Sequence, residues 1–236
     1  IHHYEEIYSD PQAQKERFLA IWRQLSGIFS SLPQNCFFEI LNEPHDQLSA
    51  ELWNTFLAQA IDGIREKNPN RTLIIGTAEW GGLQALQKLE IPEEENNLIL
   101  TVHYYSPFEF THQGAEWVDG SDAWLGTTWQ GTYEEGLAVK NEFSQIKAWA
   151  DENDMPVYVG EFGAYGKAPM ESRAHWTSFV SKEAERQGFS WAYWEFCSGF
   201  GVFDSNNEKW NAELLNALIP ECSQARAMQS AEPGFP

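Results

Sequence analysis

Two glutamates stand at the ends of apolar, strand-like segments, and they are the first sign of chemistry in this sequence. The segment FFEILNEPH (residues 37–45) places Glu43 after a hydrophobic run, and VYVGEF (residues 157–162) does the same for Glu161. Side chains alternate along a strand, so Glu43 shares a face with Leu41, and Glu161 shares a face with Val159. We therefore predict that both carboxylates face each other at one rim of a sheet.

A pair of carboxylates at a concave, aromatic-rich site matches the requirements of glycosidic bond hydrolysis. One protonated carboxyl gives its proton to the leaving oxygen, and one ionised carboxylate attacks the sugar or activates water. The eleven tryptophans and eight tyrosines supply flat apolar faces for stacking. The competing interpretation, that each glutamate only pairs with a neighbouring base, is disfavoured because 15 Lys and Arg oppose 35 Asp and Glu.

The elements that would position these residues alternate between strand and helix patterns. The predicted strands are Ile1–Tyr4, Cys36–Asn42, Leu73–Thr77, Leu98–Tyr104, Val157–Glu161 and Trp191–Phe196. The predicted helices cover residues 11–31, 50–67, 82–89, 133–151, 170–187 and 211–218. Strand followed by helix, repeated six times, predicts βα units with a parallel sheet and hence the α/β class.

The positions of the polar residues favour a closed barrel over an open doubly wound sheet. Five of the predicted strands carry polar or aromatic residues at their C-terminal ends, as a (β/α)8 TIM barrel does. No glycine-rich phosphate loop follows the first strand, which argues against a nucleotide-dependent enzyme. We predict an incomplete TIM barrel over residues 1–220, with about six βα units and units 1 and 2 missing, followed by a C-terminal tail at 221–236.

Charge and composition exclude several classes of partner. The net charge of −20 over 236 residues repels nucleic acid and acidic membrane surfaces, so a neutral ligand is favoured. No run approaches the roughly 20 apolar residues of a transmembrane helix. The three cysteines show no metal-type spacing.

Several motifs agree in order and position with one known family. The segments HHY (2–4), LNEP (41–44), HYY (103–105), GEFG (160–163) and WAYWEF (191–196) together resemble family 5 of the glycoside hydrolases. The chain is most similar to compact bacterial endo-β-1,4-glucanases, some of which also accept β-mannan, and the similarity runs from Ile1 to about Ile219. The resemblance implies a retaining hydrolase in which Glu43 is the general acid/base and Glu161 is the nucleophile.

The resemblance also implies roles for residues that bind sugar or hold the nucleophile, namely His2, His3, Asn42, His103, Tyr105 and Trp194. Three further residues are candidates for outer sugar subsites because of their type and position, namely Glu79, Trp80 and Trp117. The segment Ser106–Trp129 is predicted to be a substrate loop. We expect no cofactor and no metal, since the histidines lack regular ligand spacing.

Part of the family pattern does not fall within this chain. Family members carry an arginine on the second strand, and Glu39, predicted to point inward below Glu43, would need a partner from the missing strands. We therefore expect self-association or a complementing N-terminal fragment to close the barrel.

The sequence leaves several alternatives open. The substrate is β-glucan or mannan polysaccharide, so a β-mannanase and a non-catalytic carbohydrate-binding remnant remain alternatives to the glucanase. Localisation is undetermined, because any signal peptide would precede Ile1. An extracellular location is slightly favoured over a cytoplasmic one.

Overall fold

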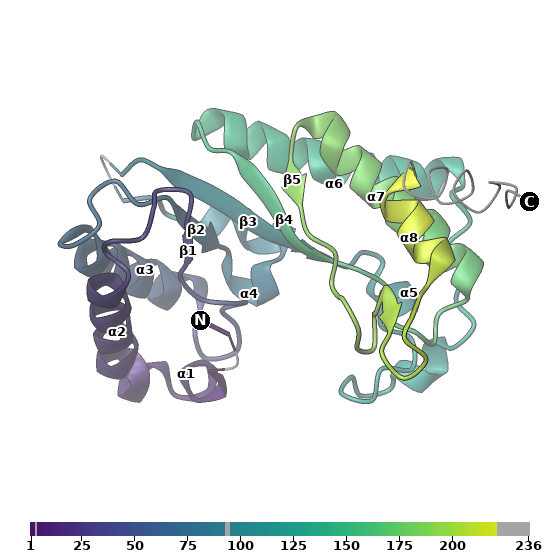
Figure 1. Cartoon of the computed structure of the whole chain (residues 1–236), viewed down its shortest axis with the longest axis horizontal. Helices are drawn as coiled ribbons and strands as arrows, with labels where there is room; N and C mark the ends of the chain where they lie inside the picture. Colours follow the sequence, from purple (N-terminus) through teal and green to yellow (C-terminus); the bar gives the residue numbers. More distant parts are fainter. Residues whose placement is uncertain (3, 93–94, 221–236) are drawn as a thin grey trace, which may run out of the picture. The chain divides into compact units, whose positions relative to one another are not determined.

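The computed structural model describes residues 1–2, 4–92 and 95–220 (Figure 1). The chain forms two compact units. Unit 1 comprises Ile1–His103 with Gln145–Tyr158, and unit 2 comprises Tyr104–Ser144 with Val159–Pro236. The tail predicted at residues 221–236 lies outside the described residues.

The central feature is a sheet whose described strands follow the order β1-β2-β3-β4-β5. The strands are β1 (Phe38–Glu39), β2 (Leu73–Gly76), β3 (Leu98–Tyr104), β4 (Val157–Phe162) and β5 (Ser190–Trp191). Strands β1 and β2 are parallel, as are β2 and β3, with Phe38 opposite Leu73 and Leu73 opposite Leu98. The spatial order equals the chain order and helices connect the strands, as in a series of βα units, so the predicted α/β class is confirmed.

Unit 1 carries several helical segments beside strands β1 and β2 (Figure 1). They are α1 (Glu5–Ser9), α2 (Pro11–Ile28), α3 (Ala50–Arg65), α4 (Ala78–Gly81) and the 3-10 helix η1 (Leu83–Lys88). Helix α2 packs on α1 and α3, and the buried rings of Phe18 and Phe56 lie 6.3 Å apart between α2 and α3. Asp10 caps α2 by accepting from the Ala13 N–H at 3.2 Å, directly before Pro11.

A buried arginine fixes the chain that leads from α2 into β1. Arg71 is 1% exposed and donates to the backbone carbonyls of Leu32 at 2.8 Å and Cys36 at 2.9 Å. Its guanidinium also lies 5.0 Å from the centre of the Phe38 ring. The guanidinium thus satisfies carbonyls that no helix partner reaches and aligns the start of the strand that leads to Glu43.

Unit 2 is built on helices that pack against one another and on a small hairpin. Its elements are α5 (Phe108–Thr111), η2 (Ser121–Trp124), α7 (Met170–Gln187), β6 (Phe203–Asp204), β7 (Lys209–Trp210) and α8 (Ala212–Leu218). Helix α6 (Tyr133–Glu152), like β3 and β4, has residues in both units. Helix α7 packs on α8, and the ring of Trp176 on α7 lies 6.2 Å from Tyr104 at the end of β3.

The structure corrects several predicted boundaries. The predicted strand Ile1–Tyr4 is wrong, because none of its described residues is in a strand, although the Ile1 carbonyl accepts from the Asn42 N–H at 2.8 Å. The strand predicted at 36–42 contracts to Phe38–Glu39, and the one at 191–196 contracts to Ser190–Trp191. Both observed strands are shorter than predicted, because a strand ends where no partner strand continues beside it. Helix α1 was not predicted, since five residues are too short to show a period.

No described helix is long and apolar enough to cross a membrane.

Candidate active site

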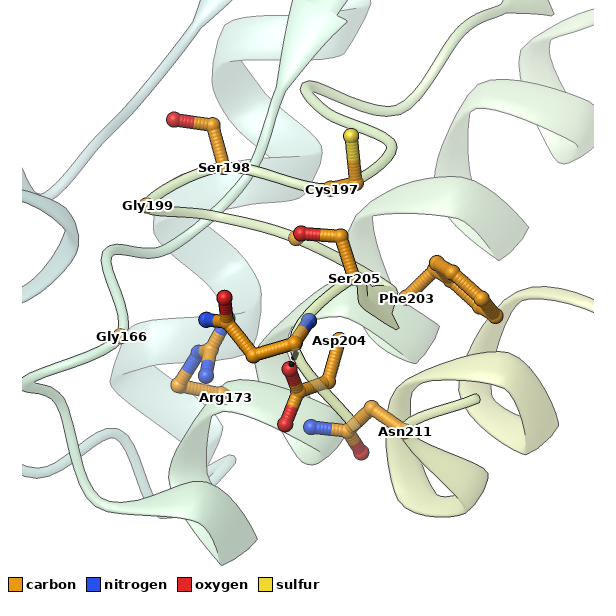
Figure 2. Close-up of a pocket in the computed structure, with 11 residues that line it drawn as sticks. Gly166, Arg173, Cys197, Ser198, Gly199, Phe203, Asp204, Ser205 and Asn211 are labelled. Atoms are coloured by element: carbon orange, nitrogen blue, oxygen red, sulfur yellow. Dashed lines mark hydrogen bonds between the residues drawn. The ribbon is translucent and has the colours of Figure 1, made fainter. Parts of the chain in front are cut away.

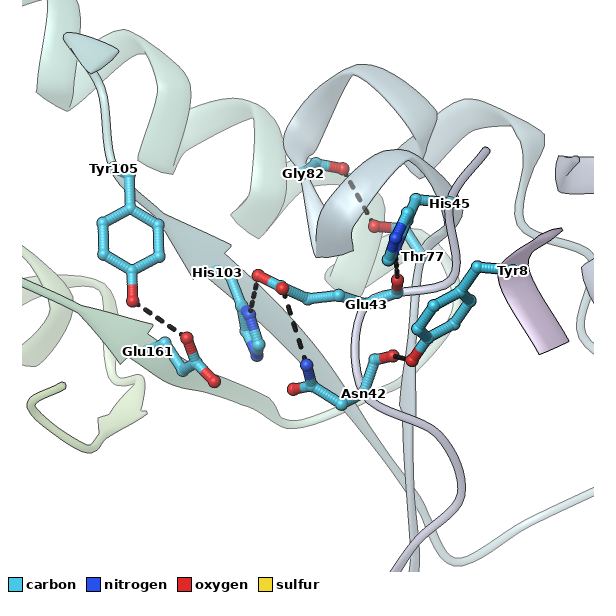
Figure 3. A network of polar contacts seen from close by, with 9 residues as sticks. All are labelled: Tyr8, Asn42, Glu43, His45, Thr77, Gly82, His103, Tyr105 and Glu161. Atoms are coloured by element: carbon cyan, nitrogen blue, oxygen red, sulfur yellow. Dashed lines mark hydrogen bonds and ion pairs between the residues drawn. The ribbon is translucent and has the colours of Figure 1, made fainter. Parts of the chain in front are cut away.

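Glu43 lies just beyond β1 and is held by a histidine from β3. Its Oε1 is 2.8 Å from His103 Nδ1, and the side chains are 23% and 4% exposed respectively (Figure 3). Its Oε2 lies 3.5 Å from Asn42 Nδ2. A carboxylate that accepts from an imidazole on another part of the sheet has a fixed direction, which a group that transfers protons requires.

The backbone at Glu43 is strained rather than extended. Its φ is 42°, in the left-handed region that residues other than glycine rarely occupy. Strand β1 has already ended at Glu39, so simple alternation along a strand does not place the Glu43 side chain. The turn beyond β1, and not the strand, therefore aims the carboxylate.

Glu39 is half-buried, whereas the sequence predicts that it points inward and is enclosed. A partner for its carboxylate from further strands stays a prediction.

The loop after β2 presents Trp80 as an open aromatic face. Trp80 is 53% exposed, and one side of it stacks on the ring of His45 at 4.9 Å with 15° between the planes. Glu79, beside it, pairs with Lys88 at 2.5 Å, so its carboxylate is already engaged. Trp80 suits stacking on a flat ligand, whereas Glu79 connects this loop to Lys88.

Glu161 lies on β4 within unit 2 and is 9% exposed. The Tyr105 hydroxyl donates to Glu161 Oε2 at 2.8 Å (Figure 3). Tyr105 is itself fixed, because the Thr111 hydroxyl donates to its carbonyl at 2.7 Å. A buried carboxylate that accepts from a phenol has a fixed orientation, which a nucleophile requires, and the nucleophile role of Glu161 stays a prediction.

The predicted substrate loop is a folded segment that contains α5 and η2. Trp117 in this loop is 59% exposed, and its ring meets the edge of Tyr165 at 5.0 Å. Neighbouring Glu116 accepts from Tyr165 at 2.6 Å and pairs with Lys167 at 2.8 Å. Hydrogen bonds from Lys167 and then Tyr165 lower the pKa of Glu116 to about 2. We call the contacts of Glu116 with Tyr165 and Lys167 the Glu116 latch. The sequence analysis missed it, since no local pattern links Glu116 to residues so far along the chain.

The remaining predicted residues have less informative surroundings. Trp194 is half-buried beyond β5, and its N–H donates to the Phe162 carbonyl at 2.9 Å. His2 is exposed, and His3 lies outside the described residues. Sugar contacts by these three residues stay predictions.

A cavity of about 230 Å³ lies in unit 2 around Arg173, and none of the predicted site residues lines it (Figure 2). Arg173 is 4% exposed and donates to the carbonyls of Ala164 at 2.9 Å and Phe200 at 3.2 Å. Its hydrogen bonds tie two loops together, which is a structural role. The two glutamates therefore stay the candidate catalytic residues, and none of the predicted site residues belongs to this cavity.

Comparison with known proteins identifies the family. The profile described as Cellulase (glycosyl hydrolase family 5) matches residues 1–199. Endoglucanase H of Acetivibrio thermocellus is 34% identical over 92% of this chain, which corresponds to 23% of that protein. Endoglucanase C of the same organism is 28% identical over 90% of this chain and 68% of its own length. The chain thus spans about a quarter of the first relative.

Solved structures agree in fold. Cel5A of Thermotoga maritima in complex with mannotriose is 54% identical, with a TM-score of 0.91, over 93% of this chain and 71% of that one. The same enzyme with cellobiose gives 55% identity and a TM-score of 0.91 over the same shares. These relatives confirm the TIM-barrel type of fold, of which this chain forms a part. From the match over residues 1–199 and the likeness to these endoglucanases, we conclude that the chain belongs to glycoside hydrolase family 5, the cellulase family.

Proposed function

We propose that this chain is the catalytic region of a retaining endo-β-1,4-glucanase. The observation that carries the proposal is that the family match over residues 1–199 includes two glutamates, each with an oriented carboxylate. Glu43 is in contact with His103 at 2.8 Å, and Glu161 accepts from Tyr105 at 2.8 Å. We assign the general acid/base role to Glu43 and the nucleophile role to Glu161.

In the first step Glu161 attacks the anomeric carbon of the substrate. The bond between that carbon and the leaving sugar oxygen breaks, while the Glu43 carboxyl gives its proton to this oxygen. The Tyr105 hydroxyl supports the ionised form of Glu161 because it donates to Oε2. Retention requires the two carboxyl groups to lie about 5 to 5.5 Å apart in the working enzyme.

In the second step Glu43 acts as a base. It takes a proton from water, whose oxygen attacks the anomeric carbon and displaces Glu161. The sugar is released with its original anomeric configuration, and both glutamates return to their starting protonation states. A hydrogen bond from Asn42 to the sugar 2-hydroxyl would strengthen in the transition state of both steps.

The substrate we propose is a neutral β-1,4-linked polysaccharide. The net charge of −20 disfavours polyanions, and the exposed faces of Trp80 and Trp117 suit the flat C–H faces of sugar rings. Mannan is the second candidate, because the Thermotoga maritima relative binds mannotriose as well as cellobiose. Subsite roles for His2, Glu79 and Trp194 belong to the same proposal, which requires neither cofactor nor metal.

The test is a reducing-sugar assay on carboxymethyl-cellulose, barley β-glucan and glucomannan. We expect hydrolysis by the wild type, loss of activity in Glu43→Gln and Glu161→Gln, and no loss in the control Glu16→Gln, which alters an exposed residue of α2. NMR of the fresh product reports the anomeric configuration. Substantial hydrolysis in either catalytic variant, or inversion, would refute the assigned roles, and polysaccharide binding without turnover would support the carbohydrate-binding remnant.

We also propose that further strands complete the barrel, either from a second copy or from a complementing N-terminal fragment. Strands β1 and β5 stand at the two ends of the described strand order, so each has one side open to pairing. Size-exclusion chromatography with light scattering decides between the sources. A stable, compact monomer would exclude self-association.

A further inference from the structure

The turn that carries Glu43 is held by an unusual set of donors. Its three successive backbone carbonyls, at residues 42, 43 and 44, each accept a hydrogen bond from a different aromatic residue. The first two donors are the Tyr8 hydroxyl and His45 Nδ1 at 2.5 Å (Figure 3). The third is the backbone N–H of Trp80, which donates to the Pro44 carbonyl at 3.2 Å. Donors that converge on a turn with a φ of 42° at its centre hold it in a conformation that it would otherwise leave.

The same three residues stack on one another. The rings of Tyr8 and His45 lie 3.9 Å apart with 33° between their planes, and those of His45 and Trp80 lie 4.9 Å apart with 15°. His45 is therefore the middle ring. Its position is restricted from both faces, which fixes the direction of its Nδ1–H.

The protonation states of the donors suit this role. A carbonyl can only accept, so His45 Nδ1 carries a proton in this contact. Burial, followed by the charges of Glu5 and Glu43, raises the pKa of Tyr8, so its hydroxyl stays a donor throughout the pH range of an assay. Tyr8 lies on the short helix α1, so its hydrogen bond to the Asn42 carbonyl connects that helix to the turn.

We propose that Tyr8 and His45 are positioning residues for the acid/base glutamate, which they hold through the backbone of residues 42–43. This inference rests on the proposed function of Glu43. The side-chain direction of a residue follows its backbone, so a turn that relaxes moves the carboxyl relative to the leaving oxygen. Neither residue touches the substrate in this role, and both act through the backbone of the turn.

Positioning of an acid has a kinetic signature that a purely structural role lacks. A natural sugar leaving group needs a proton, whereas 2,4-dinitrophenolate leaves without one. The ratio kcat/KM reports the first chemical step for both kinds of substrate. Loss of acid positioning therefore lowers kcat/KM on barley β-glucan and leaves kcat/KM on 2,4-dinitrophenyl β-cellobioside nearly unchanged.

The experiment uses Tyr8→Phe and His45→Phe in the full chain, because both keep an aromatic ring and remove one donor. The matched control is Tyr4→Phe, which removes the hydroxyl of another buried tyrosine that donates to Gln14 Oε1 at 2.8 Å. We expect about a 10-fold loss on β-glucan in both test variants, equivalent to about 1.4 kcal/mol, and at most about a twofold loss on the activated substrate. The control should keep both activities.

Hydrogen exchange of a peptide covering residues 40–48 supplies a readout that needs no activity. We expect exchange to be about 10-fold faster in both test variants and unchanged in the control, with α3 peptides unaffected in all. Equal losses on the two substrates, or unchanged exchange at 40–48, would overturn the inference. A wild type that hydrolyses neither substrate overturns the proposed function instead, and exchange alone then decides whether the two donors hold the turn.

Discussion

Replacing Tyr105 by Phe removes one hydrogen bond from the proposed nucleophile and leaves the packing in place. The hydroxyl donates to Glu161 Oε2 at 2.8 Å, and Glu161 is only 9% exposed. A hydrogen bond to a charged group contributes about 1.5 to 3 kcal/mol. At about 1.36 kcal/mol for each factor of ten, kcat/KM should fall by about 10-fold to 150-fold. The ring of the new Phe retains its neighbours His112 at 5.0 Å and Phe200 at 6.0 Å, so the fold should persist.

The assay is kcat/KM on barley β-glucan, with thermal unfolding by circular dichroism as the check on the fold. Tyr165→Phe is the matched control, because it also removes a phenol that donates to a carboxylate, at 2.6 Å, but that carboxylate belongs to exposed Glu116. We expect less than about a threefold change in the control, since water replaces the lost donor. A Tyr105→Phe enzyme that keeps the wild-type rate and fold would refute the reasoning that Tyr105 supports the nucleophile.

Three further predictions follow from the same structure. Arg71→Met should lower the free energy of unfolding in urea by about 3 kcal/mol or more, because buried carbonyls lose their donors. The control Arg23→Met, at an exposed position, should change it by less than about 0.5 kcal/mol. Equal urea midpoints for the two variants would contradict this prediction. The pKa of Glu116 is lowered from 4.5 to about 2, so its contacts with Tyr165 and Lys167 should persist above pH 4.5 and be lost as the pH falls through about 2. Hydrogen exchange of residues 112–118, corrected for intrinsic rates, should therefore rise as the pH falls over that window. No rise would count against these contacts. Activity should be bell-shaped in pH, because the proposed mechanism needs one protonated and one ionised carboxyl at the same time, and a profile that is flat between about pH 4 and 8 would argue against it.

The sequence predicted the long, strongly patterned elements well. Helices α2, α3, α6 and α7 lie close to their expected bounds, because each shows a repeating apolar face and several show a start or stop residue. Strands β3 and β4 were predicted to within one residue at each end. The short strands β1 and β5 were over-extended, because strand length depends on partners that a single segment does not reveal.

The site residues divide in the same way. Glu43 and Glu161 could be found from the sequence because each combines a charged residue with an apolar strand, and the motif order supplied the family. The contacts of Tyr8 and Arg71 could not be found, because each binds the backbone of a distant segment. The contact of His45 with the nearby Glu43 carbonyl could not be found either, because it depends on the conformation of the turn. Backbone acceptors look alike in every sequence, so no residue type marks them in advance.

By itself the sequence determined the class of fold, the family and the two glutamates, since these depend on residue type, periodicity and the order of motifs. Only the tertiary structure decided how Glu43 is aimed, because a left-handed turn held by three donors replaces the simple alternation of a strand. It also decided that Glu116 is latched and that Arg71 serves carbonyls rather than a substrate. The physical reason is common to these cases: hydrogen bonds between residues far apart in the chain depend on packing, and packing is a property of the folded molecule and not of any local pattern.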